Sequence, residues 1–222
     1  MTAFVWLGGV LFVGALAFCG YSYAVPWGHA GAFDLAVVPI DVLLFSAFAL
    51  HHSVFAREPV KRWLGSVVPQ PMLRSVYVWI ASSLLIGVSV AWQPAGGEIY
   101  RHSGLLAVIH AIVQLAGVAI IASAVRAIDA LELAGIRPHS GQESLQIVGP
   151  FRFVRHPLYS GWLLVTFGAA HMTGDRLIFA GISTLYLLIA MPFEERSLAM
   201  SFGRAYDEYR KRVRFRIVPY VY

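Results

Sequence analysis

The segment from Gly104 to Val125 has the sequence GLLAVIHAIVQLAGVAIIASAV and contains no charged residue. A helix needs about 20 apolar residues to cross a hydrocarbon core about 30 Å thick. Similar runs lie at residues 3–24, 36–56 and 74–93. Backbone groups in lipid must hydrogen-bond within their own segment, so all four runs are predicted to be helices. The sequence therefore predicts an all-α integral membrane protein.

The composition supports a membrane protein. Of the 222 residues, 58% are hydrophobic and only 13% are charged, whereas a soluble domain carries about 25% charged residues. We expect one membrane domain over residues 1–222, with a four-helix N-terminal part (1–125) and a cofactor-binding catalytic part (126–222). The first run lacks a basic region before it, so it is expected to be a retained helix and not a signal peptide.

The apolar region from residue 157 to 192 is interrupted by Gly174, Asp175 and Arg176. This interruption predicts two shorter helices that form a C-terminal hairpin, which gives about six transmembrane helices in a polytopic bundle. The mixture of basic, Trp and Leu residues between positions 57 and 64 is typical of a short helix in the headgroup region.

The distribution of basic residues predicts the orientation. With the N-terminus in the cytoplasm, only Arg101 and Arg176 of the 17 Lys and Arg residues fall in outer loops. The positive-inside rule then favours six spans, both termini cytoplasmic, in the inner (cytoplasmic) membrane. The basic residues are confined to certain loops, which argues against nucleic acid as a partner. Membrane lipids are the expected partners, and the basic run 210–212 can bind anionic lipid.

Two polar clusters flank the predicted hairpin. An antiparallel hairpin would bring Arg155 and His156 opposite Glu194 and Glu195 at its cytoplasmic base. Adjacent carboxylates at the end of an apolar helix are costly unless they are paired. Arginines or a cationic ligand can pair with them, and S-adenosylmethionine (SAM) carries an ammonium and a sulfonium group. The clusters therefore favour a ligand site.

The local sequence around His156 also suits a ligand. Pro157 fits the first turn of a helix, which places His156 near the N-cap. A helix N-terminus attracts anions such as a ligand carboxylate. Gly149 and Gly161 permit close approach of the backbone.

Five motifs in a fixed order carry a family resemblance. They are Gly-Pro-Phe at 149–151, Arg-His-Pro-Leu-Tyr-x-Gly at 155–161, Glu-Glu at 194–195, Phe-Gly-x-x-Tyr-x-x-Tyr at 202–209 and Lys-Arg-Val at 211–213. Over about residues 145–219 the chain resembles the isoprenylcysteine carboxyl methyltransferase and phospholipid methyltransferase superfamily. The resemblance implies a SAM-dependent methyltransferase with no metal.

The resemblance also assigns roles to residues. The expected cofactor-binding residues are Gly149, Arg155, His156, Pro157, Tyr159, Glu194 and Glu195. Arg212 would face the methyl acceptor and, with His156, take a catalytic role. Tyr206 and Tyr209 are candidate substrate contacts, although interfacial anchoring explains them equally well. Phe151 departs from the family pattern, which often has Tyr at this position.

The N-terminal half of the chain resembles one branch of this superfamily. The stretches from His51 to Arg57 and from Arg74 to Val78 resemble the NnrU-type branch, which includes proteins similar to methanethiol S-methyltransferase. The implied acceptor is lipophilic, or a small thiol or carboxylate.

Other interpretations remain open. The chain could be a non-catalytic NnrU-like membrane assembly factor. His51, His52 and His110 could ligate haem in a haem-binding membrane protein, although a structural hydrogen bond is the simpler role for each. Asp41 and Gln114 could serve as polar bridges between helices.

Overall fold

The computed structural model describes residues 2–55, 57–128, 131, 134–136 and 145–221. It is helical, with one two-stranded sheet among the described residues. The chain divides into two compact units, and each is described by itself. Within the described residues, five helices are long and apolar enough to cross a membrane, which confirms the predicted all-α membrane bundle.

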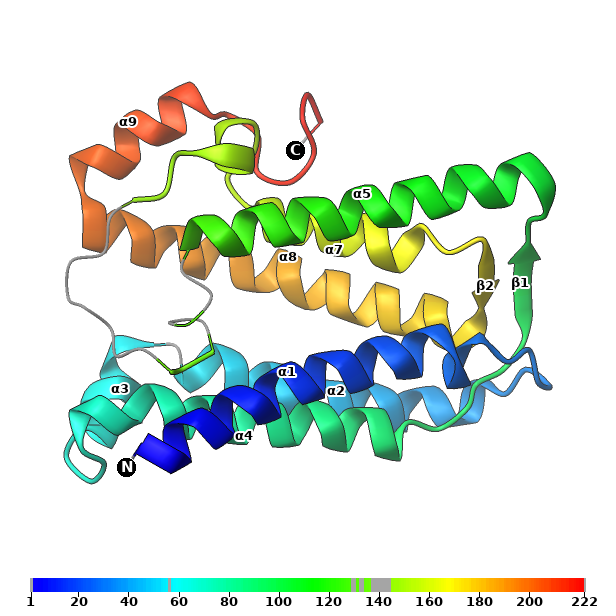
Figure 1. Ribbon diagram of the computed structural model, residues 1–222, viewed down its shortest axis with the longest axis horizontal. Coiled ribbons are helices and arrows are strands. Elements are labelled where there is room, and N and C mark those ends of the chain that lie inside the picture. The colour runs from blue at the N-terminus through cyan, green and yellow to red at the C-terminus, as the bar shows by residue number, and fades with distance from the viewer. Residues whose placement is uncertain (1, 56, 129–130, 132–133, 137–144, 222) are drawn as a thin grey trace. The chain divides into compact units, whose positions relative to one another are not determined.

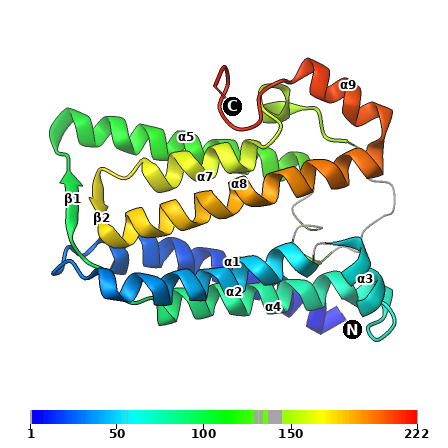
Figure 2. The ribbon, with the colours of Figure 1, turned by 180° about the vertical axis from the view of Figure 1, so that it is seen from behind.

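Unit 1 comprises the described residues within 1–98, 130–142 and 173–178. Its elements are α1 (Thr2–Ala24), η1 (Pro26–Gly28), η2 (Leu35–Val37), α2 (Val38–Phe55), α3 (Glu58–Leu64) and α4 (Gln70–Ala91). Both α1 and α2 pack against α4 (Figures 1 and 2). Phe4 stacks on the indole of Trp79 at 5.4 Å. Helix α3 confirms the short helix predicted between the second and third spans.

The first turn of α8 (Gly174–Phe202) belongs to unit 1 and buries two charged side chains. The carboxylate of Asp175 accepts three hydrogen bonds, from the indole N–H of Trp92 (2.9 Å) and the backbone N–H groups of Ala95 (2.8 Å) and Gly96 (2.9 Å). The guanidinium of Arg176 donates to the carbonyls of Tyr23 (2.9 Å) and Ala24 (2.7 Å). Charged groups stay buried only when hydrogen-bonded in this way. The three residues expected to interrupt the hairpin therefore begin a helix.

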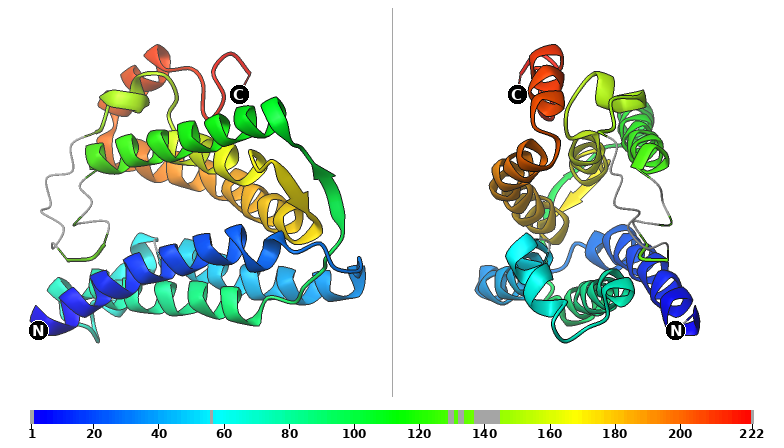
Figure 3. Two further views of the ribbon diagram at one scale, coloured as in Figure 1. Left: turned by 45° about the vertical axis from the view of Figure 1, so that its right-hand side comes forward. Right: turned by 90° about the vertical axis from the view of Figure 1, so that its left-hand side faces the viewer.

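Unit 2 comprises the described residues within 99–129, 143–172 and 179–222. Its elements are β1 (Glu98–Arg101), α5 (Gly104–Ile128), η3 (Gly149–Arg152), α7 (Pro157–Phe167), β2 (His171–Thr173), the rest of α8 and α9 (Arg204–Arg212). Strands β1 and β2 pair with each other. Helices α5 and α7 pack together (Figure 3). The indole N–H of Trp162 in α7 donates to the hydroxyl of Ser183 in α8 at 2.9 Å.

Helix α7 is the short member of the predicted hairpin. Its 11 residues rise only about 16 Å, which is too little to cross a membrane alone. At the end of α7, Gln114 of α5 donates to the carbonyl of Val165 (2.9 Å), and His110 donates to the carbonyl of the C-cap residue Gly168 (3.0 Å). The backbone N–H of His102 donates to the carbonyl of Ala170 (2.8 Å). Residues 157–172 therefore combine a short helix with extended chain, and carbonyls that the end of α7 leaves unpaired find donors on α5.

Candidate functional site

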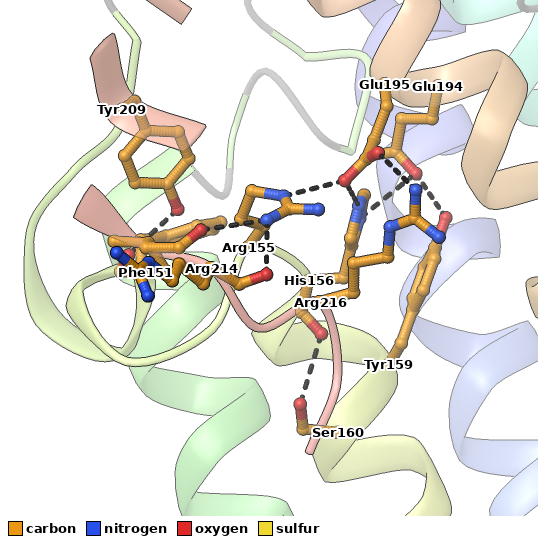
Figure 4. Close-up of polar contacts among 11 residues, drawn as sticks. Phe151, Arg155, His156, Tyr159, Ser160, Glu194, Glu195, Tyr209, Arg214 and Arg216 are labelled. Atoms are coloured by element: carbon orange, nitrogen blue, oxygen red, sulfur yellow. Dashed lines mark hydrogen bonds and ion pairs between the residues drawn. The ribbon is translucent and has the colours of Figure 1, made fainter. Parts of the chain in front are cut away.

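Four segments of unit 2 converge around two adjacent carboxylates (Figure 4). The acids are Glu194 and Glu195, in the last turns of α8. The start of α7 brings His156 and Tyr159, and the turn before it brings Arg155. The C-terminal segment 213–217 brings Arg216.

Glu195 is buried and has three cationic or imidazole partners. Its Oε1 accepts from Nε of Arg155 at 2.7 Å and lies 3.4 Å from Nε2 of His156. Its Oε2 lies 3.3 Å from Nη2 of Arg216. A buried carboxylate is tolerated only with such compensation. Glu195 is thus the centre that holds the three other side chains in place.

Glu194 is far more accessible, with 46% of its side chain exposed against 7% for Glu195. The hydroxyl of Tyr159 donates to its Oε2, and Nδ1 of His156 lies 3.6 Å from the same atom. The imidazole of His156 therefore lies between the two carboxylates and is itself buried. A neutral imidazole has one donor nitrogen, whereas an imidazolium can donate to both acids.

The C-terminal segment forms one wall of the site. Nη1 of Arg155 donates to the carbonyls of Val213 (2.8 Å) and Arg214 (2.7 Å). The backbone N–H groups of Arg155 and His156 donate to the carbonyls of Phe215 (3.0 Å) and Arg216 (2.8 Å), and the hydroxyl of Ser160 donates to that of Ile217. Five consecutive carbonyls therefore fix the start of α7. Val213 and Ile217 are buried, which anchors the wall.

Two tyrosines of α9 pack behind this wall. Tyr206 and Tyr209 are buried with Val213, and the hydroxyl of Tyr209 donates to the carbonyl of Phe151 at 2.8 Å. Burial raises the pKa of Tyr206 to about 12 and also raises the pKa of Tyr209. Both phenols are therefore protonated at neutral pH and cannot act as bases. Their packing is that of structural side chains.

A cavity of about 610 Å³ opens beside Glu195. Its volume falls within the range of about 300–1,000 Å³ typical of small-molecule sites. Five cationic and two acidic side chains line it, namely Arg155, Arg210, Lys211, Arg214, Arg216, Glu195 and Asp207. The cavity therefore has an excess of positive charge next to an acidic pair.

The structure brings most of the predicted cofactor-binding residues together. Arg155, His156, Tyr159, Glu194 and Glu195 form the network described above. Pro157 is the first residue of α7 and His156 its N-cap, as expected.

Four other predicted residues lie outside this network. Gly149 begins η3 with φ of +58°, a backbone conformation that favours glycine. Arg212 is exposed at the end of α9 and is absent from the cavity lining. Tyr206 and Tyr209 are also absent from that lining.

Sequence reasoning missed Arg216. The signal was available, because Val213, Arg214, Phe215, Arg216 and Ile217 alternate apolar and basic residues. Such alternation predicts an extended segment with one apolar and one basic side.

The histidines left open above have local roles. The imidazole of His110 donates a hydrogen bond to the carbonyl of Gly168. In unit 1, His52 is hydrogen-bonded to the hydroxyl of Tyr77. His51 stacks on Phe55 (4.4 Å) and Tyr77 (5.5 Å), and its ring nitrogens have no hydrogen-bond partner among the described residues.

Comparison with known proteins identifies the family. A profile of the phospholipid methyltransferase family matches residues 106–205. Methanethiol S-methyltransferase 2 of Bradyrhizobium diazoefficiens is 36% identical over 92% of this chain and 83% of its own length. Methanethiol S-methyltransferase of Crocosphaera subtropica is 34% identical over 82% and 74%, and nurim of Danio rerio is 31% identical over 84% and 74%. The chain therefore belongs to the methanethiol S-methyltransferase-like branch of the phospholipid methyltransferase and isoprenylcysteine carboxyl methyltransferase superfamily, and it is a membrane methyltransferase.

Proposed function

We propose that the protein transfers a methyl group from SAM to a small thiol, with methanethiol as the first acceptor to test. One observation carries the proposal. The two glutamates, His156, Tyr159 and two arginines converge, and Glu195 and both arginines of this cluster line a cavity of small-molecule size. Relatives named as methanethiol S-methyltransferases support a small sulfur acceptor.

The residues present fit SAM in charge and in size. The ligand is cationic at its ammonium and sulfonium groups and anionic at its carboxylate. The half-exposed carboxylate of Glu194 suits the ammonium group, and the cationic lining of the cavity suits the carboxylate. SAM supplies an electrophilic methyl group, so no covalent protein nucleophile is needed.

The chain has two tasks in this reaction, which are to orient the reactants and to remove a proton. A thiol must lose its S–H proton as its sulfur forms the new S–CH₃ bond, because the thiolate is the nucleophile. His156, which lies between Glu194 and Glu195, is the group that we propose receives that proton. Holding both reactants in line supplies the rest of the acceleration.

Transfer from labelled SAM to methanethiol tests the proposal. Purified protein in detergent is incubated with methyl-labelled SAM and methanethiol, and volatile, lipid and protein fractions are separated. We expect label in dimethyl sulfide, and loss of that signal in His156→Ala with SAM binding measured in parallel. Label in lipid or protein alone, or no transfer to any small thiol, would refute the thiol assignment.

We also propose an inner-membrane location with both termini in the cytoplasm, so that SAM enters from the cytosol and an apolar acceptor from the bilayer. Fifteen of the 17 basic residues support this orientation. The single cysteine, Cys19, is buried, so Tyr220→Cys in a Cys19→Ser background offers one exposed thiol. A membrane-impermeant maleimide should label it only after the cells are broken. Labelling in intact cells would contradict the orientation.

A further inference from the structure

We infer that Arg216 binds the carboxylate of the cofactor's amino-acid group, while the neighbouring Glu194 binds its ammonium group. This inference rests on the proposed use of SAM. It assigns a ligand role to an arginine that lies beyond the motifs carrying the family resemblance.

Arg216 lies at the acidic pair and also reaches the cavity. Its Nη2 lies 3.3 Å from Oε2 of Glu195, and 34% of its side chain is exposed. It belongs to the cavity lining, and Figure 4 shows its side chain directed toward Glu194, Glu195 and Tyr159. A guanidinium has five N–H donors in a planar fork, so a contact with Glu195 is compatible with binding a ligand carboxylate as well.

Three of the four other cationic residues of the lining are less suited to this task. Arg155 is only 7% exposed, and it already donates to Glu195 and to two backbone carbonyls. Arg210 and Lys211 are highly exposed and pair with acids one turn away on α9. Such exposed pairs contribute little to binding or stability.

The geometry of an amino-acid group requires two opposite charges side by side, because its ammonium and carboxylate are attached to the same carbon. Glu194 offers a half-exposed carboxylate, and Arg216 offers a guanidinium at the adjacent Glu195. The position of Arg216 is set from two sides. Its carbonyl accepts from the backbone N–H of His156 at 2.8 Å, and the buried Ile217 follows it. A guanidinium fixed in this way matches a carboxylate through parallel N–H donors.

Calorimetric titration with S-adenosylhomocysteine and two truncated analogues tests the inference. One analogue lacks the carboxylate and the other lacks the amino group. In Arg216→Gln we expect at least about tenfold weaker binding of S-adenosylhomocysteine, the loss typical of a charge-assisted hydrogen bond, and unchanged binding of the carboxylate-free analogue. In Glu194→Gln we expect unchanged binding of the analogue that lacks the amino group, and weaker binding of the two ligands that carry it. Arg216→Lys should recover part of the affinity, because the charge remains.

Arg204→Gln is the matched control, since Arg204 is an exposed arginine at the start of α9 outside the cavity lining. It should bind all three ligands like the wild type. The inference is overturned if Arg216→Gln binds S-adenosylhomocysteine with wild-type affinity. An altered pH–rate profile in that case would indicate that Arg216 contacts the acceptor thiolate instead. It is also overturned if the variant loses all three ligands equally. Wild-type protein that binds none of them would refute the proposed function itself.

Discussion

Replacing Gly161 with alanine should push α7 away from α5 and disorganise the site. A Cβ at Gly161 would lie 2.7 Å from the carbonyl oxygen of Gly117 and 2.6 Å from Cγ1 of Ile121. Ordinary contact begins at 3.4 Å, so the helices must separate by about 0.7–0.8 Å. The side chain of Ile121 can rotate, but the carbonyl of Gly117 belongs to the backbone and cannot yield.

The consequence reaches the site because Tyr159 and His156 lie within two turns of Gly161 on the same short helix. The contact between His156 and Glu195 is already 3.4 Å long, and a shift of this size takes it beyond hydrogen-bonding distance. We expect a loss of about 1–3 kcal/mol in the free energy of unfolding. Turnover should fall by about 100-fold, as a misplacement near 1 Å can cause.

The assay is thermal unfolding in detergent together with turnover and S-adenosylhomocysteine titration. Gly181→Ala is the control, because a Cβ at this exposed position of α8 meets no atom within 4 Å. It should leave both quantities unchanged or raise stability slightly through helix propensity. Wild-type stability and turnover in Gly161→Ala would show that the close helix contact does not position the site.

Four further substitutions separate packing from binding. Glu195→Gln should cost about 3–5 kcal/mol of unfolding free energy, because it leaves the buried Arg155 without its counter-charge. Glu194→Gln should keep the wild-type melting temperature and lose cofactor affinity. An equal fall in melting temperature in the two variants would contradict a structural role for Glu195 and a ligand role for Glu194. Gln114→Leu should destabilise the protein by about 1–3 kcal/mol, since the carbonyl of Val165 loses its hydrogen-bond donor. Urea unfolding that matches the wild type would show that this hydrogen bond does not stabilise the protein. Tyr209→Phe should lower the free energy of unfolding by about 0.5–1.5 kcal/mol with little change in cofactor affinity, because the Tyr209 hydroxyl donates to a backbone carbonyl. A loss of cofactor affinity without a loss of stability would show that Tyr209 contacts a ligand.

The sequence predicted the membrane helices well, because apolar runs of sufficient length have few alternatives in lipid. The convergence of His156 with Glu194 and Glu195 also followed from sequence, since an antiparallel hairpin brings its two open ends together. The sequence predicts an interruption between two helices at Asp175 and Arg176, because charged residues rarely lie inside a membrane helix. Their burial depends on donors and acceptors from distant segments, which hydropathy cannot show.

The division of labour within the site was harder to foresee. The sequence treats Glu194 and Glu195 as equals, and only the packing of α8 decides which one is buried. Arg212 and Arg216 are both tail arginines, and the cavity lining includes only the second. That choice depends on how the chain turns after α9, where the backbone of Arg216 pairs with that of His156. Such long-range pairing leaves only a weak alternation in the sequence.

The short helix α7 and the extended chain after it matter for anyone who assigns topology by counting hydrophobic helices. The described chain has five helices of sufficient length, and an odd count places the two ends of a polypeptide on opposite faces of the bilayer. The proposed orientation, with both termini in the cytoplasm, requires the stretch from Pro157 to Met172 to supply one further crossing. A topology drawn from helix count alone would place Arg216, in the tail after α8, on the opposite face from Arg155 and His156, although Arg216 and His156 pair through their backbones.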